Sequence, residues 1–144
     1  MEVSGSAKPA EILLGEDNPA DVYLIRQALE EHGIRFNLQV AAHGGEVLDF
    51  ISGAPLQVPD LIVLDLNLPR YEGLEVLKTV RQTNALSRVP VVILTSSDSP
   101  RDRLAASELG ADCYIRKPSN LDEFLEIGKT LQGLLTKAQG ATAS

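Results

Sequence analysis

The sequence predicts an α/β fold, a doubly wound parallel sheet in a single domain, and two observations support this prediction. Five short apolar runs, rich in Leu and β-branched residues, recur at about residues 11–14, 37–41, 61–64, 91–94 and 113–116. The stretches between them carry apolar residues at helical spacing, so strands and helices alternate along the chain. Strands joined by helical crossovers run parallel, and the helices cover both faces of such a sheet.

The first predicted helix has clear start and stop signals. Asn18 is suited to the N-cap, Pro19 to the first helical position, and Gly33 to the position just past the end. Between them, apolar side chains recur every three or four residues, at Val22, Ile25 and Leu29. We therefore expect an amphipathic helix that starts soon after the first strand.

The remaining helices are predicted from similar apolar stripes. These stripes lie within residues 47–51, 74–80, 104–109 and 121–135. Breaks at Gly53, at residues 84–90 and at Gly110 follow the first three of these four stripes. These three helices therefore connect one strand to the next, and the helix within residues 121–135 follows the last strand.

The character of each apolar run indicates its place in the sheet. Residues 61–64 and 91–94 are apolar without alternation, as strands covered on both faces must be. Leu38, Gln39 and Val40 alternate, which is typical of an edge strand. Right-handed crossovers then favour the strand order 2-1-3-4-5, a flavodoxin-like (βα)5 sheet in which ligands bind beyond the carboxyl ends of the strands.

Length and composition are those of one acidic domain. The chain has 144 residues, 44% of them hydrophobic, and a formal net charge of −7. One hydrophobic core is enough for a chain of this length. Because 20 acidic residues face 13 basic ones, and Lys and Arg are scattered, we expect no surface for nucleic acid or for an anionic membrane.

Cysteine content and the chain ends favour a cytoplasmic protein. Cys113 is the only cysteine, so no intramolecular disulfide can form, which suits a reducing compartment. No apolar run has the length of a signal peptide or a membrane span. The small and polar ends predict a disordered N-terminal segment at 1–10 and a flexible C-terminal tail at 137–144, around one domain at 11–136.

Polar side chains follow four of the predicted strands at the point where each strand ends. They are the acidic pair Glu16 and Asp17, then Asp65, Thr95 and Lys117. The carboxyl ends of parallel strands meet at one edge of a sheet, so these groups are expected to lie together. Three carboxylates in contact repel one another, and either protonation or a bound cation must relieve that repulsion.

This set of residues suits phosphoryl chemistry with a divalent cation. Oxygen ligands with open positions favour Mg2+, which keeps several waters and completes its octahedron with phosphate oxygens. Asp65, central and at a strand end, can accept a phosphoryl group as an acyl phosphate. Lys117 would neutralise charge on that group, and the Thr95 hydroxyl would hydrogen-bond one of its oxygens.

The same residues resemble those of the receiver domains of two-component response regulators. The acidic pair, the Asp, the Thr followed by Ser96 and the Lys followed by Pro118 occur in the receiver order, at receiver-like intervals, over about residues 11–136. The resemblance implies that a sensor histidine kinase transfers a phosphoryl group from a phosphohistidine to Asp65, with Mg2+ as cofactor.

The resemblance also implies a set of metal ligands. Asp17 and Asp65 would bind Mg2+ directly, together with the backbone carbonyl of Asn67. Glu16 would assist through a water molecule. It stands where many receivers carry a second Asp, and its longer side chain puts the detailed coordination geometry in question.

Phosphorylation would then switch an interaction face. Thr95 and Lys117 would contact the phosphoryl oxygens, and Tyr114 would be the aromatic switch that turns inward when Thr95 moves. The face built from the fourth helix, the fifth strand and the fifth helix would bind a downstream protein target or a second copy, giving a homodimer. No output domain follows residue 136, so we expect the protein to act by contact.

A narrower resemblance is to the stand-alone receivers that partner bacteriophytochrome-type kinases. It rests on three segments, EDNPAD at 16–21, DLNLPR at 65–70 and LTSS at 94–97. It implies a light-sensing kinase as the partner.

Two other functions share this fold or this chemistry. An aspartyl-phosphate phosphatase would need an acid/base carboxylate two residues after the nucleophile, where this chain has Asn67. A flavodoxin-like flavin binder would favour neutral or donor-rich loops around the flavin phosphate, whereas Glu16, Asp17 and Asp65 are acidic. We therefore expect a phosphoacceptor signalling protein and not an enzyme.

Overall fold

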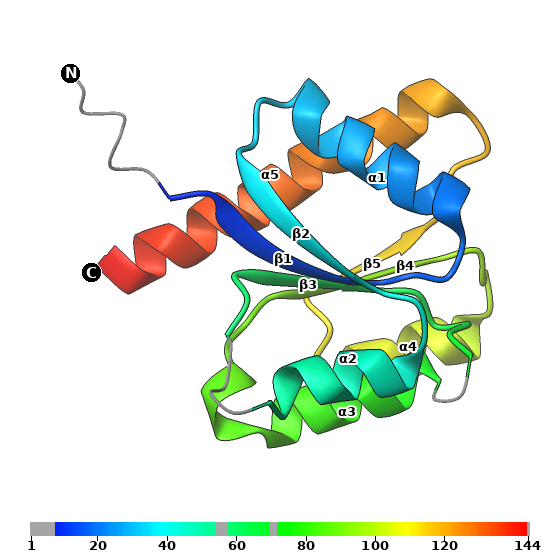
Figure 1. Ribbon diagram of the computed structural model, residues 1–144. Helices are drawn as coiled ribbons and strands as arrows, with labels where there is room; N and C mark the ends of the chain where they lie inside the picture. Colours follow the sequence, from blue (N-terminus) through cyan, green and yellow to red (C-terminus); the bar gives the residue numbers. More distant parts are fainter. Residues whose placement is uncertain (1–7, 54–57, 70–71, 144) are drawn as a thin grey trace.

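The computed structural model describes residues 8–53, 58–69 and 72–143 and shows a three-layer α/β fold (Figure 1). Within these ranges, five parallel strands pair in the order β2-β1-β3-β4-β5. The predicted flavodoxin-like strand order is confirmed. The strands are β1 (Ala10–Gly15), β2 (Phe36–Ala41), β3 (Leu61–Leu64), β4 (Val91–Thr95) and β5 (Cys113–Arg116).

Helices cover both faces of the sheet. The first and last helices lie on one face, and the other three lie on the opposite face (Figure 1). The helices are α1 (Pro19–Glu31), α2 (Gly44–Ile51), α3 (Gly73–Gln82), α4 (Pro100–Glu108) and α5 (Leu121–Ala143), with a short 3-10 helix, η2 (Asn84–Leu86), after α3.

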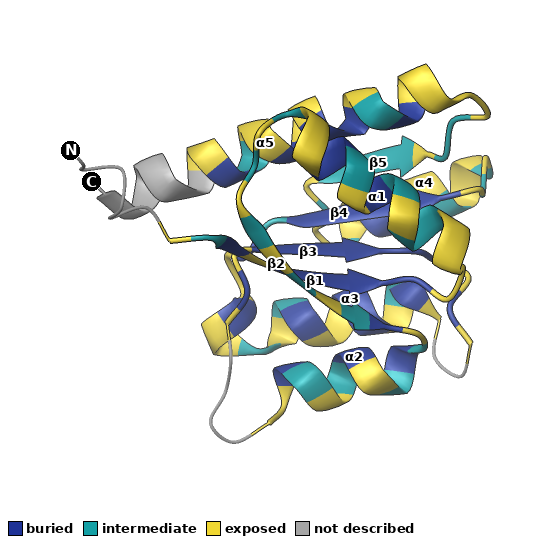
Figure 2. Cartoon of the chain, turned by 45° about the horizontal axis from the view of Figure 1, so that its top comes forward, coloured by how far each residue is buried: buried dark blue, intermediate teal, exposed yellow. Residues whose placement is uncertain are grey.

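The central strands β3 and β4 are buried along their whole length, as their unbroken apolar sequence predicts (Figure 2). Ile62 and Leu64 pack in the cluster that includes α2 and α3. Leu61 and Val63 pack in the cluster that includes α1 and α5. The sheet therefore divides the hydrophobic core into two halves, one under each helix layer.

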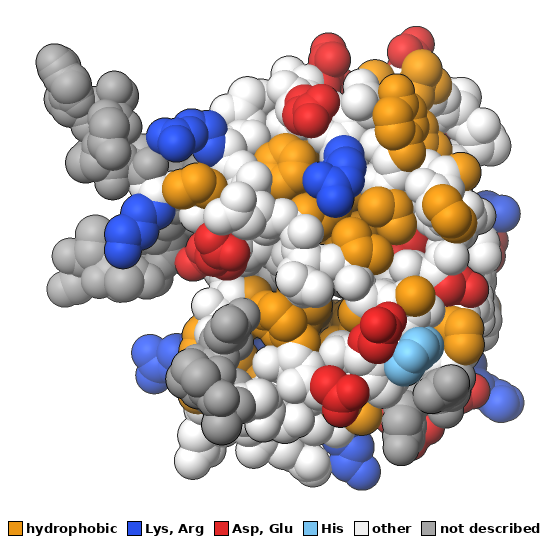
Figure 3. Space-filling view, in the orientation of Figure 1, with side chains coloured by type: hydrophobic (Ala, Val, Ile, Leu, Met, Phe, Trp, Pro, Cys, Tyr) orange, Lys and Arg blue, Asp and Glu red, His pale blue; other side chains and the backbone are white. Residues whose placement is uncertain are grey.

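Strand β2 lies at the edge of the sheet, as its alternating sequence predicts. A shallow groove runs between this strand and α2, and hydrophobic side chains show there in Figure 3. Glu46 and Asp49 of α2 line the groove beside Gln39.

The first helix begins at the predicted residue. The side chain of its N-cap, Asn18, accepts a hydrogen bond from the backbone N–H of Ala20 at 2.9 Å, and Pro19 occupies the first helical position. Gly33, two residues past the end, has a φ of 69°, which glycine adopts without Cβ strain. The N-cap therefore fixes the first turn of α1 directly after β1.

Helix α5 packs closely against α1 because Gly128 has no side chain. A Cβ atom at this position would clash with the backbone carbonyl of Ala28 and with the ring of His32. The His32 Nε2 atom lies 3.1 Å from the carbonyl oxygen of Leu125. These contacts hold α5, and with it the loop that enters α5 from β5, against the body of the domain.

Both ends of the domain differ slightly from the expected boundaries. Strand β1 begins at Ala10, so the last residue of the expected N-terminal segment belongs to the sheet, and residues 1–7 lie outside the described ranges. Helix α5 continues to Ala143, past the expected boundary at residue 136, through a stretch rich in good helix formers. In the described part of the chain, no helix is both long enough and apolar enough to cross a membrane.

Candidate functional site

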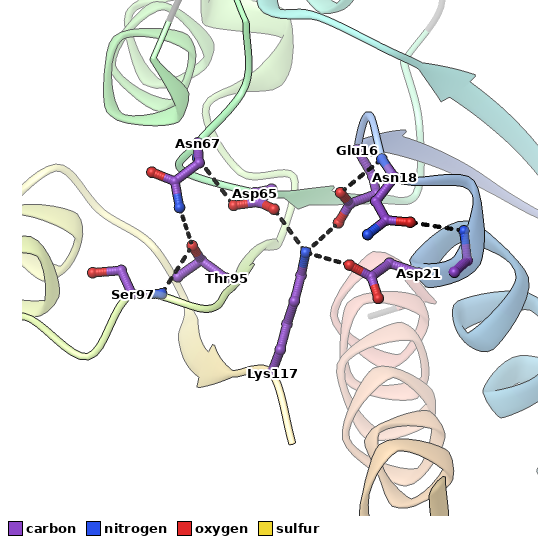
Figure 4. A network of polar contacts seen from close by, with 9 residues as sticks. Glu16, Asn18, Asp21, Asp65, Asn67, Thr95, Ser97 and Lys117 are labelled. Atoms are coloured by element: carbon purple, nitrogen blue, oxygen red, sulfur yellow. Dashed lines mark hydrogen bonds and ion pairs between the residues drawn. The ribbon is translucent and has the colours of Figure 1, made fainter. Parts of the chain in front are cut away.

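The carboxyl ends of the strands bring Glu16, Asp65, Thr95 and Lys117 together (Figure 4). The Lys117 Nζ atom lies 2.8 Å from Oδ2 of Asp65 and 2.8 Å from Oε1 of Glu16. Glu16, Asp65 and Thr95 are buried, with exposed fractions of 2%, 5% and 0%. The structure thus gathers four of the residues that the strand ends single out in the sequence.

Sheet hydrogen bonds fix the backbone of these residues. The backbone N–H of Asp65 donates to the carbonyl of Gly15 at 3.0 Å. The N–H of Lys117 donates to the carbonyl of Thr95 at 2.7 Å. Each functional side chain therefore leaves from a strand end whose neighbour sets its position.

The Asp65 carboxylate is held at both of its oxygens. Lys117 contacts Oδ2, and the backbone N–H of Asn67 donates to Oδ1 at 3.0 Å. Helix α3 begins close to the backbone at this point, because a Cβ on Gly73 would clash with the carbonyl oxygen of Asp65 and with Cα of Leu66. The carboxylate is therefore fixed in one orientation at the end of β3.

Asp21 also contacts Lys117, although it does not follow a strand. Its Oδ2 atom lies 2.7 Å from Nζ. Asp21 is the third residue of α1, and the first turn of this helix lies beside the strand ends (Figure 4). The sequence prediction includes Asp21 only within the EDNPAD segment. Its position three residues after the N-cap Asn18 is the signal that would have identified it.

The cluster around Lys117 carries more negative than positive charge. Glu16, Asp21 and Asp65 surround one ammonium group, which leaves two negative charges uncompensated when all are ionised. Burial by itself lowers the pKa of Lys117, but hydrogen bonds to the three carboxylates outweigh burial and raise it above its ordinary value. Burial raises the pKa of Glu16, and the contact with Lys117 opposes that rise only in part. Lys117 is therefore protonated at neutral pH, in a site with excess negative charge.

The donor set fits a divalent cation held by few protein ligands. The carboxylates of Asp65 and Glu16 are hard oxygen ligands, and Asp17 is exposed at the start of the loop after β1. Among the residues that the structure describes, no three acidic, His or Cys side chains are arranged to enclose a metal ion by themselves. An ion bound here would keep positions for water and phosphate oxygens, which is the coordination that Mg2+ prefers.

Thr95 and Tyr114 lie on the β4 and β5 side of the site. Thr95 Oγ1 accepts a long hydrogen bond from the backbone N–H of Ser97, at 3.4 Å. The Tyr114 hydroxyl donates to the backbone carbonyl of Ser97 at 3.1 Å, and the Arg103 guanidinium lies 4.4 Å from the centre of the Tyr114 ring. Tyr114 therefore contacts the loop that follows Thr95, and its role as a switch stays a prediction.

Comparison with known proteins identifies the family. A model of the response regulator receiver domain matches residues 12–129. The chain belongs to this family. Response regulator Rcp1 of Synechocystis sp. is 37% identical over 135 residues, which cover 90% of this chain and 88% of Rcp1. Response regulator MprA of Mycolicibacterium vanbaalenii is 35% identical over 136 residues, which cover 94% of this chain and 56% of MprA.

Solved structures of related receivers share the fold. The phosphorylated cyanobacterial phytochrome response regulator RcpA has a TM-score of 0.82 and 34% identity, over 90% of this chain and 95% of RcpA. The Mn2+-bound form of Rcp1 has a TM-score of 0.79 and 36% identity, over 86% of this chain and 92% of the Rcp1 chain. RPA3017, a response regulator in red light signalling of R. palustris, has a TM-score of 0.75 and 27% identity, over 86% of this chain and 91% of RPA3017.

The function class follows from these relatives. The chain is a receiver-domain response regulator of two-component signalling. The predicted resemblances to receivers, and to receivers associated with phytochromes, are confirmed. Receiver domains bind a divalent metal, and one Rcp1 structure holds Mn2+. The alternatives of an aspartyl-phosphate phosphatase and a flavin binder receive no support from these relatives.

Proposed function

We propose that Asp65 accepts a phosphoryl group from a phosphohistidine of a sensor histidine kinase, with Mg2+ assisting the transfer. The position of the Asp65 carboxylate is the observation that supports this most. Lys117 and the backbone N–H of Asn67 hold its two oxygens, within a cluster that has excess negative charge. A carboxylate fixed in this way is oriented for attack, and the excess charge attracts a divalent cation.

The transfer exchanges one bond to phosphorus for another. A carboxylate oxygen of Asp65 attacks the phosphorus of the phosphohistidine while the P–N bond breaks. The imidazole leaves with the bonding electron pair, which a proton from solvent neutralises. The ammonium of Lys117 compensates charge on the phosphoryl oxygens, and the Thr95 hydroxyl donates a hydrogen bond to one of them.

Mg2+ would neutralise phosphoryl charge when bound. Asp17, Asp65 and the backbone carbonyl of Asn67 would hold it, and Glu16 would assist through water. The hard oxygen donors of the site and the Mn2+ in the Rcp1 structure support this assignment. Asp17 is exposed, so its carboxylate is accessible to an ion that enters from solvent.

Incubation with Mg2+ and acetyl phosphate tests the assignment of Asp65. We expect the wild-type protein to gain the mass of one phosphoryl group and Asp65→Asn to gain none, because an amide is not a nucleophile for this transfer. Asp60→Asn is a matched control at the other end of β3, where Asp60 Oδ2 accepts the N–H of Glu11 at 2.8 Å. It should be labelled like the wild type. An unlabelled wild type, or an Asp65→Asn variant labelled as fast as the wild type, contradicts the proposal.

We infer that phosphorylation changes the face formed by α4, β5 and α5. Tyr114 of β5 contacts the loop after Thr95, and Leu104 of α4 is 61% exposed beside charged residues such as Arg103. To reverse a two-state equilibrium fully, the phosphoryl group must favour the active state by about 5 kcal/mol. The exposed face would bind a downstream target or a second copy of the chain. Light scattering should show a homodimer that tightens on phosphorylation, and a monomer in both states excludes that dimer.

A phytochrome-type histidine kinase is the partner that we propose, in the cytoplasm. The similarity to RcpA and to RPA3017, which act in phytochrome and red light signalling, supports this choice. Phosphotransfer profiling against the sensor kinases of the source organism tests it. A phytochrome-type kinase should label the protein fastest, and preferential labelling by another class of kinase contradicts the choice.

A further inference from the structure

We propose that Asp21 competes with the phosphoryl group for Lys117 and thereby limits how tightly the site holds that group. The inference rests on the proposed phosphorylation of Asp65. Asp21 is a positioning residue, because it acts through Lys117. The inference starts from the three carboxylates that surround the single ammonium group of Lys117.

Three carboxylates surround the Lys117 ammonium, which donates hydrogen bonds to Asp21 and Asp65 and forms an ion pair with Glu16. Nζ lies 2.7 Å from Asp21, 2.8 Å from Glu16 and 2.8 Å from Asp65 (Figure 4). An ammonium group has three donors, and these distances are those of charge-assisted hydrogen bonds. A phosphoryl oxygen on Asp65 therefore competes with these carboxylates for the Lys117 ammonium.

Asp21 is the partner that Lys117 can release most easily. The side chains of Glu16 and Asp65 are 1% and 6% exposed, whereas that of Asp21 is 18% exposed. A deeply buried carboxylate that loses its cation is left unpaired away from water, which is strongly unfavourable. Asp21 lies nearer the solvent, so water can replace Lys117 as its partner. Because Asp65 is itself the phosphorylated group, the Lys117–Asp21 bond is the one that we expect to break.

Asp21 is also fixed in place. It lies in the first turn of α1, whose N-cap Asn18 accepts the N–H of Ala20 at 2.9 Å and donates its own backbone N–H to Glu16 Oε2 at 3.2 Å. These two hydrogen bonds tie the first turn of α1 to the end of β1, away from any movement of Lys117 toward a phosphoryl group on Asp65. The contact with Asp21 therefore opposes the movement of Lys117.

Beryllofluoride, an analogue of the phosphoryl group that needs no kinase, tests the competition. Its Kd is measured by calorimetry in the presence of Mg2+ for the wild type, Asp21→Asn and Asp21→Glu. We expect Asp21→Asn to bind about two- to fivefold more tightly, the effect of one partly exposed ion pair. Asp21→Glu restores the carboxylate and returns the Kd toward the wild-type value. A merely structural role for Asp21 would loosen the site and weaken binding, so a gain in affinity separates the two roles.

A second variant and a second measurement complete the test. Asp122→Asn removes a carboxylate from the first turn of α5, so it controls for the change in net charge and should leave the Kd unchanged. In a crystal structure with Mg2+ and beryllofluoride, Lys117 Nζ should lie beyond about 3.5 Å from Asp21 and within about 3.2 Å of a fluoride.

Three results would overturn the inference. They are an unchanged or weaker affinity in Asp21→Asn, an equal gain in Asp122→Asn, and an intact Lys117–Asp21 bond in the beryllofluoride complex. A wild-type protein that does not bind beryllofluoride would instead contradict the proposed phosphorylation of Asp65, so the two failures are distinguishable.

Discussion

Lys117 and Arg81 lie at opposite ends of the same sheet, and each binds carboxylate, but in different surroundings. Lys117 lies at the carboxyl ends of the strands, where three carboxylates contact its ammonium. Arg81 of α3 reaches the amino ends of β4 and β5. There it donates to the carbonyls of Gly110 and Val89, both at 2.8 Å, and pairs with Asp112 at 2.9 Å.

The two surroundings differ in their balance of charge. Arg81 contacts one carboxylate and several neutral carbonyls, and Asp112 also accepts the backbone N–H of Val91 at 2.8 Å. Charge is balanced there, and the donors of the guanidinium hold three chain segments together. The cluster around Lys117 is left with excess negative charge. A balanced network stabilises the fold, whereas an unbalanced one is ready to bind a cation and a phosphoryl group.

Removing Lys117 should have the largest effect on activity. Lys117→Ala takes away the cation beside the transferring group, and we expect phosphorylation by acetyl phosphate to slow by about 10²- to 10³-fold. The measurement is the rate of mass gain in the presence of Mg2+. Arg81→Ala removes the same charge from the other end of the sheet and should keep a rate close to that of the wild type. Equal slowing in both variants would contradict the claim that only the Lys117 end of the sheet takes part in phosphorylation.

Removing Arg81 should have the largest effect on stability among changes at its end of the sheet. Arg81→Ala leaves carbonyls without their donor and Asp112 without its cation, and we expect the free energy of unfolding in urea to fall by about 2–3 kcal/mol. Arg81→Lys should recover only part of this loss, because an ammonium lacks the planar fork that reaches Gly110 and Asp112 together. A loss below about 0.5 kcal/mol for Arg81→Ala would show that this network is not structural.

The alkylation rate of Cys113 provides a smaller, local measure of how stable the sheet is near Arg81. It begins β5 directly after Asp112, and burial raises the pKa of its thiol above the usual value of 9.0. Thiolate is therefore scarce at pH 8, and the rate of alkylation should rise as the pH increases through 9 and beyond. Arg81→Ala should speed alkylation at pH 8, because the start of β5 opens more often. An equal acceleration in Asp65→Asn would show that the thiol does not report on one end alone.

The fold was largely predictable because each element has a local signal. The unbroken apolar runs at 61–64 and 91–94 identified the central strands, and Asn18 with Pro19 identified the start of α1. The end of α5 was not predictable in this way. Residues 137–143 lack an apolar stripe of the kind that identified the other helices, and their helix follows from composition alone.

The sequence predicted only those site residues that directly follow a strand. Asp65, Thr95 and Lys117 meet because parallel strands end at one edge. Asp21 reaches the same place through the angle between β1 and α1, a tertiary property that its position in the first turn after the N-cap Asn18 signals only in part. The contacts of Arg81 likewise depend on how α3 packs over the loops before β4 and β5.

The dependence of the unfolding free energy on Mg2+ tests most directly whether the excess negative charge around Lys117 forms a cation-binding site. Without Mg2+, we predict that Asp65→Asn is more stable than the wild type, because one of the repelling carboxylates is neutral. Added Mg2+ should stabilise the wild type in a saturable way and the variant much less. Asp112→Asn, the matched change at the balanced end, should be less stable than the wild type with or without Mg2+. A wild type that does not respond to Mg2+, together with an Asp65→Asn variant that is less stable than the wild type, would contradict the account.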